Sequence, residues 1–279
     1  MRRTAPAALL ILACCSSSRE ARLNEAEAIA RPAELQPHLW RAGRYAVFGF
    51  ERSGPKRRVL VVYIEGDGHA WINPWQPSTD PTPSDPIALR LAAADPARPL
   101  IYLARPCQYV AAPSCRSPLW TSERLSPAVV ETYQQVIDEA RSSADSDSIG
   151  LVGYSGGGAL ATLIAERRRD VAWLITVAAN LDLAEWVRLR DVEPLSGSLD
   201  PAANADAIER LPQIHFAGGI DPVVPPTVAK SFFARFSPSP AARLIVLPEF
   251  DHECCWVAAW PQLLELSGFR PQSADPAAQ

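Results

Sequence analysis

The stretch 149–158 reads I-G-L-V-G-Y-S-G-G-G and constrains the fold more than any other part of the chain. An apolar run meets a glycine-rich turn and passes into a helix-like segment at 159–167, which predicts a strand, a sharp turn and a helix. Glycines two positions before and after Ser155 avoid collisions with the neighbouring strand and helix. The turn would hold the Ser155 hydroxyl in the open. The alternative is a flexible glycine turn with a bystander serine.

The residue after this serine, Gly156, would stand at the N-terminus of the helix. Backbone N–H groups there have no partner within the helix, and the helix dipole favours negative charge. We therefore predict that the Gly156 N–H can donate a hydrogen bond to an oxyanion.

Length and composition allow one large α/β domain or two small ones, because 279 residues with 48% hydrophobic side chains can bury a full core. The formal net charge is -4, and basic residues cluster only in short runs such as 56–58 and 167–169. We therefore expect no nucleic-acid partner. No C-x-x-C or H-x-x-x-H spacing occurs, so we expect neither a metal ion nor a cofactor.

The N-terminus, M-R-R-T-A-P-A-A-L-L-I-L-A-C-C, resembles a bacterial lipoprotein export signal. Its apolar stretch 7–13 is far shorter than the ~20 residues of a membrane span, so residues 1–15 should be a cleaved signal. The resemblance implies a lipid on the cysteine after the cut, and Ala13 favours Cys14 over Cys15. Residues 16–38 would be a tether. An ordinary secretory signal or a buried N-terminal helix are the alternatives.

Export would place the remaining cysteines in an oxidising compartment. Cys107 and Cys115 lie eight positions apart around a proline-containing loop, which predicts a local disulfide. Cys254 and Cys255 are adjacent and would pair only in a strained ring. We expect a buried thiol there, or a thiol that pairs elsewhere.

Apolar strands alternate with helices along most of the chain. Strands are predicted at 44–51, 58–64, 99–104, 149–152 and 171–178, with helices at 126–141 and 159–167. This order predicts an α/β fold with a mostly parallel, doubly wound sheet over 39–270, followed by a flexible tail at 271–279. Segment 180–211 interrupts the alternation and is predicted to be a small cap insertion over the strand ends. The proline-rich segment 73–86 would be a loop at the rim of the site.

A serine hydroxyl needs a base, and the base needs an orienting group. His252 is the predicted base because it follows the strand 243–247 and precedes the helix 256–266. His215 lies inside an apolar strand, where a core role is expected. Asp221, which follows the strand 214–217, is the predicted acid, and Asp182 is its main rival. Asp251 adjoins the histidine and should point elsewhere.

The G-Y-S-G-G turn, Asp221 and His252, in this chain order, resemble the α/β-hydrolase superfamily. The resemblance implies that Ser155 is the nucleophile and His252 is a general base and then acid. It also implies a second oxyanion donor in the loop after the strand 58–64, assigned by position to the Asp67 N–H, with Gly68 as the alternative. Glu65 stands where the family has a histidine, which is a departure from the pattern.

These residues predict a serine hydrolase that cleaves acyl esters, as an esterase or lipase does. A serine peptidase or amidase on the same triad is the second hypothesis, so the expected substrate is a small acyl ester or a peptide. A non-catalytic, membrane-tethered binding protein with this fold is the third. The oligomeric state stays open.

Overall fold

A computed structural model describes residues 8–237 and 241–269, with side chains from residue 19 onward. Its centre is an eight-stranded sheet in the order β1-β2-β6-β3-β7-β8-β9-β10. The strands are β1 (Gln36–Ala42), β2 (Tyr45–Arg52), β3 (Val59–Ile64), β6 (Leu100–Leu103), β7 (Ser148–Tyr154), β8 (Val171–Val177), β9 (Gln213–Gly218) and β10 (Ala242–Leu247).

The sheet is parallel from β6 to β10, and only β1 and β2 run antiparallel to their neighbours. Strands β3 and β7 lie side by side at its centre and are almost wholly buried, as their apolar runs predict. The predicted α/β class and doubly wound sheet are confirmed. Because parallel strands end at one edge, the loops after β3, β7, β9 and β10 meet there.

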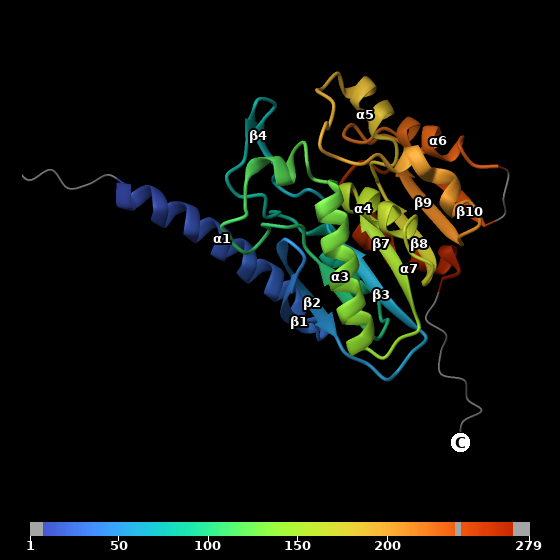
Figure 1. Ribbon diagram of the computed structural model, residues 1–279, viewed down its shortest axis with the longest axis horizontal. Helices are drawn as coiled ribbons and strands as arrows, with labels where there is room; N and C mark the ends of the chain where they lie inside the picture. The colour runs from blue at the N-terminus through green and yellow to red at the C-terminus, as the bar shows by residue number, and fades with distance from the viewer. Residues whose placement is uncertain (1–7, 238–240, 270–279) are drawn as a thin grey trace, which may run out of the picture.

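Helices cover both faces of the sheet (Figure 1). One hydrophobic core includes α3, α4, α6 and the 3₁₀ helix η3, and the other includes α1, α2 and α7. The helices are α1 (Ala8–Ala30), α2 (Ile87–Ala94), α3 (Pro127–Ser143), α4 (Gly156–Ala165), α5 (Leu183–Arg190), α6 (Pro226–Phe233) and α7 (Trp256–Ser267), with short 3₁₀ helices η1 (Arg31–Ala33), η2 (Ser117–Trp120) and η3 (Pro201–Ile208).

The expected tether at 16–38 differs from the structure. Helix α1 extends from the domain in Figure 1, and its C-terminal part packs on α2, with Ala26 and Ala30 buried. The Arg22 guanidinium donates to the Thr82 carbonyl at 2.8 Å, and β1 already begins at Gln36. The alanine- and glutamate-rich composition of this segment favours a helix, and its apolar face finds a partner on the domain. Residues 1–7 and the side chain of Cys14 lie outside the described residues, as does the predicted tail at 271–279.

Two segments lie between the regular βα units. Segment 180–211 contains α5 and η3, and η3 packs against α4 as part of the helical layer. Within the proline-rich region, β4 (Trp71–Asn73) and β5 (Gln76–Pro77) form a small hairpin that we did not predict. The hairpin projects from the domain, and Trp75 at its turn is 87% exposed.

The cysteines pair locally. Cys107 and Cys115 form the predicted disulfide, with their Cα atoms 5.7 Å apart. Cys254 and Cys255 also form a disulfide with each other, so our expectation that they would not pair is wrong. In the described part of the chain, none of the helices has the length and hydropathy needed to cross a bilayer.

Candidate active site

Ser155 occupies the turn between β7 and α4. Its backbone has φ 51° and ψ −121°, a conformation that residues other than glycine rarely adopt. A Cβ on Gly153 would lie 2.4 Å from the Gly157 carbonyl oxygen, and a Cβ on Gly157 would lie 2.3 Å from the Ile64 carbonyl oxygen. The two glycines therefore allow the strand, turn and helix to approach closely, as the sequence pattern predicts.

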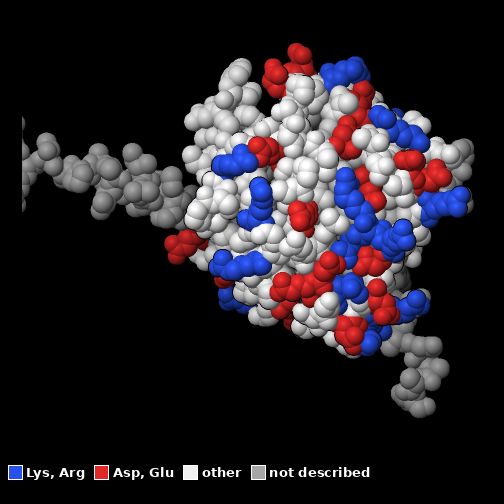
Figure 2. Space-filling model, in the orientation of Figure 1, with Lys and Arg blue, Asp and Glu red and all other residues white. Residues whose placement is uncertain are grey.

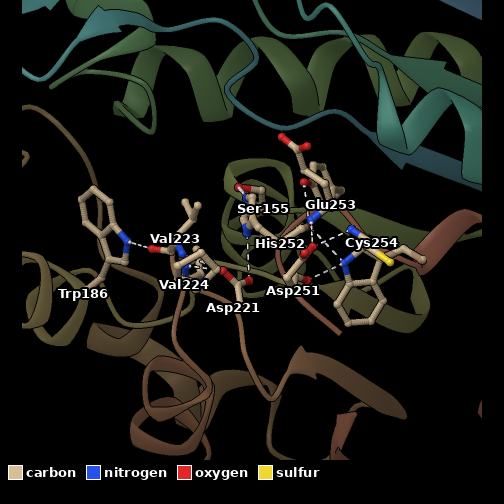
Figure 3. Close-up of polar contacts among 12 residues, drawn as sticks. Ser155, Trp186, Asp221, Val223, Val224, Asp251, His252, Glu253 and Cys254 are labelled. Carbon is tan, nitrogen blue, oxygen red and sulfur yellow. Dashed lines mark hydrogen bonds and ion pairs between the residues drawn. The ribbon is translucent and has the colours of Figure 1, made fainter. Parts of the chain in front are cut away.

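The structure brings His252 and Asp221 to this serine (Figure 3). His252 Nε2 lies 3.1 Å from Ser155 Oγ, and His252 Nδ1 lies 2.8 Å from Asp221 Oδ2. The two imidazole nitrogens thus join the hydroxyl to the carboxylate in one chain of hydrogen bonds. Three loops that are distant in sequence meet at the carboxyl edge of the sheet.

The Asp221 carboxylate is fixed by its own loop. Its Oδ1 accepts hydrogen bonds from the backbone N–H groups of Val223 and Val224, both at 2.8 Å, which leaves Oδ2 for the imidazole. The side chain has no exposed surface. The rival carboxylate, Asp182, instead accepts from the Ser231 hydroxyl at 2.7 Å and caps the N-terminus of α5. Its neighbours lower its pKa, despite desolvation.

The loop of His252 is held by contacts that the sequence did not predict. The Tyr154 hydroxyl and the Trp256 indole N–H both donate to the His252 carbonyl oxygen, at 2.9 and 3.0 Å. Asp251 points away from the serine, as expected, and accepts from the backbone N–H groups of Glu253 and Cys254, which lower its pKa. The orientation of the imidazole is therefore fixed by hydrogen bonds to the His252 backbone carbonyl as well as by those to the ring nitrogens. Only the adjacency of Tyr154 to Ser155 hinted at this role.

His215 lies in the core, as predicted. It is 1% exposed, and its ring nitrogens contact Thr176 Oγ1 at 2.8 Å and Gln213 Oε1 at 2.9 Å. Burial lowers its pKa to about 3, so the ring is neutral in the folded protein. His38 pairs with Glu51 across β1 and β2, away from the serine.

The two predicted oxyanion donors come together beside Ser155. A Cβ on Gly66 would lie 3.3 Å from Ser155 Cβ, and a Cβ on Gly156 would lie 2.3 Å from Asp67 Oδ1, so the loop after β3 crosses the start of α4. Neither the Asp67 N–H nor the Gly156 N–H donates to an acceptor among the described residues. Both groups are available to a ligand.

Gln108 holds the peptide that carries one of these donors. Its side chain is fully buried, and its Nε2 donates to the Gly66 carbonyl oxygen at 3.0 Å. The Gly66 carbonyl and the Asp67 N–H belong to the same planar peptide and point in opposite directions. Fixing the carbonyl therefore fixes the direction of the N–H. Gln108 follows the disulfide cysteine Cys107, but no pattern in the sequence predicted its role.

Glu65, which stands where the resemblance would place a histidine, anchors the loop that carries the oxyanion donor. Its carboxylate accepts hydrogen bonds from the backbone N–H groups of Gly66, Ala88 and Leu89 and from the Tyr102 hydroxyl, at 2.9 to 3.4 Å. Desolvation raises its pKa to about 7, and these hydrogen bonds oppose the rise. The side chain connects the oxyanion loop to the N-terminus of α2 and leaves the oxyanion donors unobstructed.

Three charged side chains lie next to the site, and the sequence analysis missed the two arginines among them. Asp67 Oδ1 lies 3.1 Å from an Arg105 nitrogen, and Asp67 Oδ2 lies 3.1 Å from Arg124 Nε. We name Asp67, Arg105 and Arg124 the arginine–aspartate cluster. Both arginines are buried, at most 5% exposed. Charged side chains on the face shown in Figure 2 are different, because basic and acidic groups lie side by side at the surface there. Within the described residues, no three potential metal ligands gather.

The fold is that of several solved serine hydrolases. A serine hydrolase homologue from Coxiella burnetii is 17% identical, with a TM-score of 0.57 over 83% of this chain and 95% of that protein. An esterase from Pyrococcus furiosus is 10% identical, with a TM-score of 0.58 over 85% and 93%. An acylaminoacyl peptidase from Pyrococcus horikoshii is 12% identical, with a TM-score of 0.63 over 88% of this chain but 43% of its own.

The chain thus has the α/β-hydrolase fold, and it spans less than half the length of the peptidase. Neither the models of known protein families nor the sequences of curated proteins match it.

Proposed function

We propose that this protein is a serine hydrolase that cleaves acyl esters through a covalent intermediate on Ser155. The observation that carries the proposal is the unbroken chain of hydrogen bonds from Ser155 Oγ through both His252 nitrogens to Asp221. A serine with a purely structural role needs only one hydrogen-bond acceptor, and it does not need an imidazole that is itself bonded to a carboxylate. The same arrangement supplies the base and the orienting carboxylate that acyl transfer needs.

Under this proposal, each step of acyl transfer uses a group of the candidate site. Ser155 Oγ attacks the ester carbonyl while His252 Nε2 takes its proton, and Asp221 stabilises the imidazolium that forms. The Asp67 and Gly156 N–H groups donate to the oxyanion of the tetrahedral intermediate. His252 then gives the proton to the departing alkoxide, which leaves an acyl-enzyme. Water, deprotonated by His252, attacks the acyl carbonyl and releases the acid.

Labelling with a fluorophosphonate probe tests this proposal. The wild type should react with the probe, and Ser155→Ala should not. Ser53→Ala is the matched control, because Ser53 is exposed and its hydroxyl has no part in the site, and it should react as the wild type does. Absence of labelling in folded wild type would favour the hypothesis of a non-catalytic binding protein.

An ester is the first choice of substrate, and an amide or peptide the second. An esterase and an acylaminoacyl peptidase both share this fold, so the comparison is compatible with cleavage of an ester bond or of an amide bond. p-Nitrophenyl esters of rising chain length, compared with aminoacyl anilides, separate the two. We expect turnover of the esters. Faster turnover of the anilides would assign the protein to the peptidases.

We also propose that the protein is exported and anchored by a lipid on Cys14 to a bacterial membrane, on its periplasmic or outer side. The signal-like N-terminus supports this, and so does the Cys107–Cys115 disulfide, because disulfides persist in oxidising compartments. Metabolic labelling with palmitate should disappear in Cys14→Ser. Labelling that persists in this variant and disappears in Cys15→Ser would move the lipid to the next residue.

A further inference from the structure

The arginine–aspartate cluster carries more positive charge than its own residues neutralise. It contains two guanidinium groups and one carboxylate, and the two arginines are 3% and 5% exposed. Burial of an unpaired charge is costly, so a net positive cluster in the interior favours a bound anion. The other buried carboxylate at the end of β3, Glu65, is occupied by the backbone of α2 and the Tyr102 hydroxyl.

Within the cluster, Arg124 holds the free donors. Arg105 donates to Asp67 and to the Arg124 carbonyl oxygen, which uses both of its terminal nitrogens. Arg124 uses only Nε, which is 3.1 Å from Asp67 Oδ2 without hydrogen-bond geometry. Its two terminal nitrogens have no acceptor among the described residues. The four N–H groups on these two nitrogens are therefore available to a ligand.

Contacts on both sides place Arg124 next to the candidate site. On one side, the Asp67 carboxylate that it pairs with lies against Gly156, next to the nucleophile. On the other side, its guanidinium lies 5.2 Å from the centre of the Trp186 ring on α5. The Trp186 indole N–H donates to the Val223 carbonyl in the loop that carries Asp221, as Figure 3 shows.

We propose that Arg124 binds a carboxylate of the substrate, so that the preferred substrates are acyl esters that carry a second, anionic carboxylate group. This inference rests on the proposed function. A planar guanidinium with two free terminal nitrogens matches the two oxygens of a carboxylate. Asp67 and Trp186 orient it, and Arg105 neutralises Asp67. The carboxylate replaces the missing counter-charge at the moment the ester is bound.

Matched pairs of esters test the proposal. p-Nitrophenyl hydrogen glutarate and p-nitrophenyl pentanoate differ in a carboxylate on the acyl side. 4-Acetoxybenzoate and its methyl ester differ in a carboxylate on the alcohol side. We expect kcat/KM, corrected for spontaneous hydrolysis, to favour the anionic member of one pair by about tenfold or more. Turnover of the neutral esters without a preference in either pair would overturn the inference and leave the proposed function intact.

Variants of Arg124 locate the effect. Arg124→Leu should lower kcat/KM for the anionic ester by about 10- to 100-fold and leave the neutral ester within about threefold. Arg124→Lys should recover part of the loss. Arg116→Leu is the control, because it removes an exposed arginine that pairs with Glu123 in the same segment, and it should keep the preference. Equal losses on both esters would mean that Arg124 serves the oxyanion or the fold.

A measurement on the wild type alone keeps the test valid if the Arg124 variants fail to fold. Glutarate should slow fluorophosphonate labelling of Ser155, and the neutral glutaramide should not. Equal protection by the two compounds would contradict the inference. Absence of labelling without any competitor would instead contradict the proposed function, and the inference with it.

Discussion

The two sides of the candidate site are built differently. On the side of β9 and β10, Asp221 and His252 form a simple relay in which both oxygens of the carboxylate and both nitrogens of the imidazole have partners. On the side of β3, the arginine–aspartate cluster is buried with an excess positive charge and free donors. We therefore propose that the first side carries out acyl transfer and that the second selects the substrate.

The largest expected effect separates Asp221 from its rival. Asp221→Asn should lower kcat by about 10⁴-fold, because the amide stabilises the wrong tautomer of the imidazole. Asp182→Asn should leave kcat within about tenfold and lower the stability of the protein by about 1 kcal/mol, because the neutral amide weakens the charge-assisted contacts with Ser231 and Arg235. Steady-state kinetics and urea unfolding measure the two effects. A reversed order would assign the orienting role to Asp182.

Loss of the carboxylate in the arginine–aspartate cluster should lower the stability of the protein. Asp67→Asn leaves two buried guanidinium groups without a counter-charge, which should cost about 3–5 kcal/mol of unfolding free energy. Chemical denaturation measures this cost. Glutarate should restore part of the stability of the variant by supplying an anion. A variant as stable as the wild type would show that the cluster is solvated and weak.

One pH-dependent contribution to the free energy of unfolding comes from Glu65 on the β3 side. The folded-state pKa of Glu65, about 7, exceeds its ordinary value of 4.5, so the folded protein binds this proton more tightly than the unfolded chain does. The resulting stabilisation is full below pH 4.5 and is lost as the pH rises through 7, a change of about 3 kcal/mol. In Glu65→Gln this loss should disappear when unfolding is measured from pH 4.5 to 8. An unchanged pH profile would mean that Glu65 is ionised throughout.

Substitution of Gln108 should have the smallest effect of the four. It tests whether a residue on the β3 side contributes to the reaction at Ser155. Gln108→Met keeps the volume but frees the Gly66 carbonyl, so the Asp67 N–H should lose its fixed direction. We expect kcat to fall by about 10- to 100-fold with KM changed less than about threefold, because an oxyanion donor acts in the transition state. A change in KM alone would make Gln108 part of substrate binding.

The features that could be predicted from the sequence are those that depend on local patterns. The glycines around Ser155, the position of His252 after an apolar strand and the disulfide between Cys107 and Cys115 each leave a mark within a few residues. The succession of strands and helices along the chain followed from alternating apolar runs in the same way. These features are encoded locally, because a turn or a strand needs particular residues at particular spacings.

The β3 side could not be predicted, because its partners come from distant segments. No pattern in the sequence indicates that the fold brings Arg105 and Arg124 to Asp67. Segment 16–38 was predicted to be a tether because composition alone does not show that its alanines contact α2. The Cys254–Cys255 disulfide was missed because adjacency argues against pairing. Long-range pairing of charges leaves no periodic signal in a single sequence.

The covalent state of Ser155 during turnover tests the central claim most directly. The protein, mixed with excess p-nitrophenyl ester and quenched in acid within milliseconds, should show a burst of p-nitrophenolate equal to the enzyme. Mass spectrometry should find the acyl group on the peptide that contains Ser155. An acyl group found on another residue, or undiminished turnover in Ser155→Ala, would contradict the account.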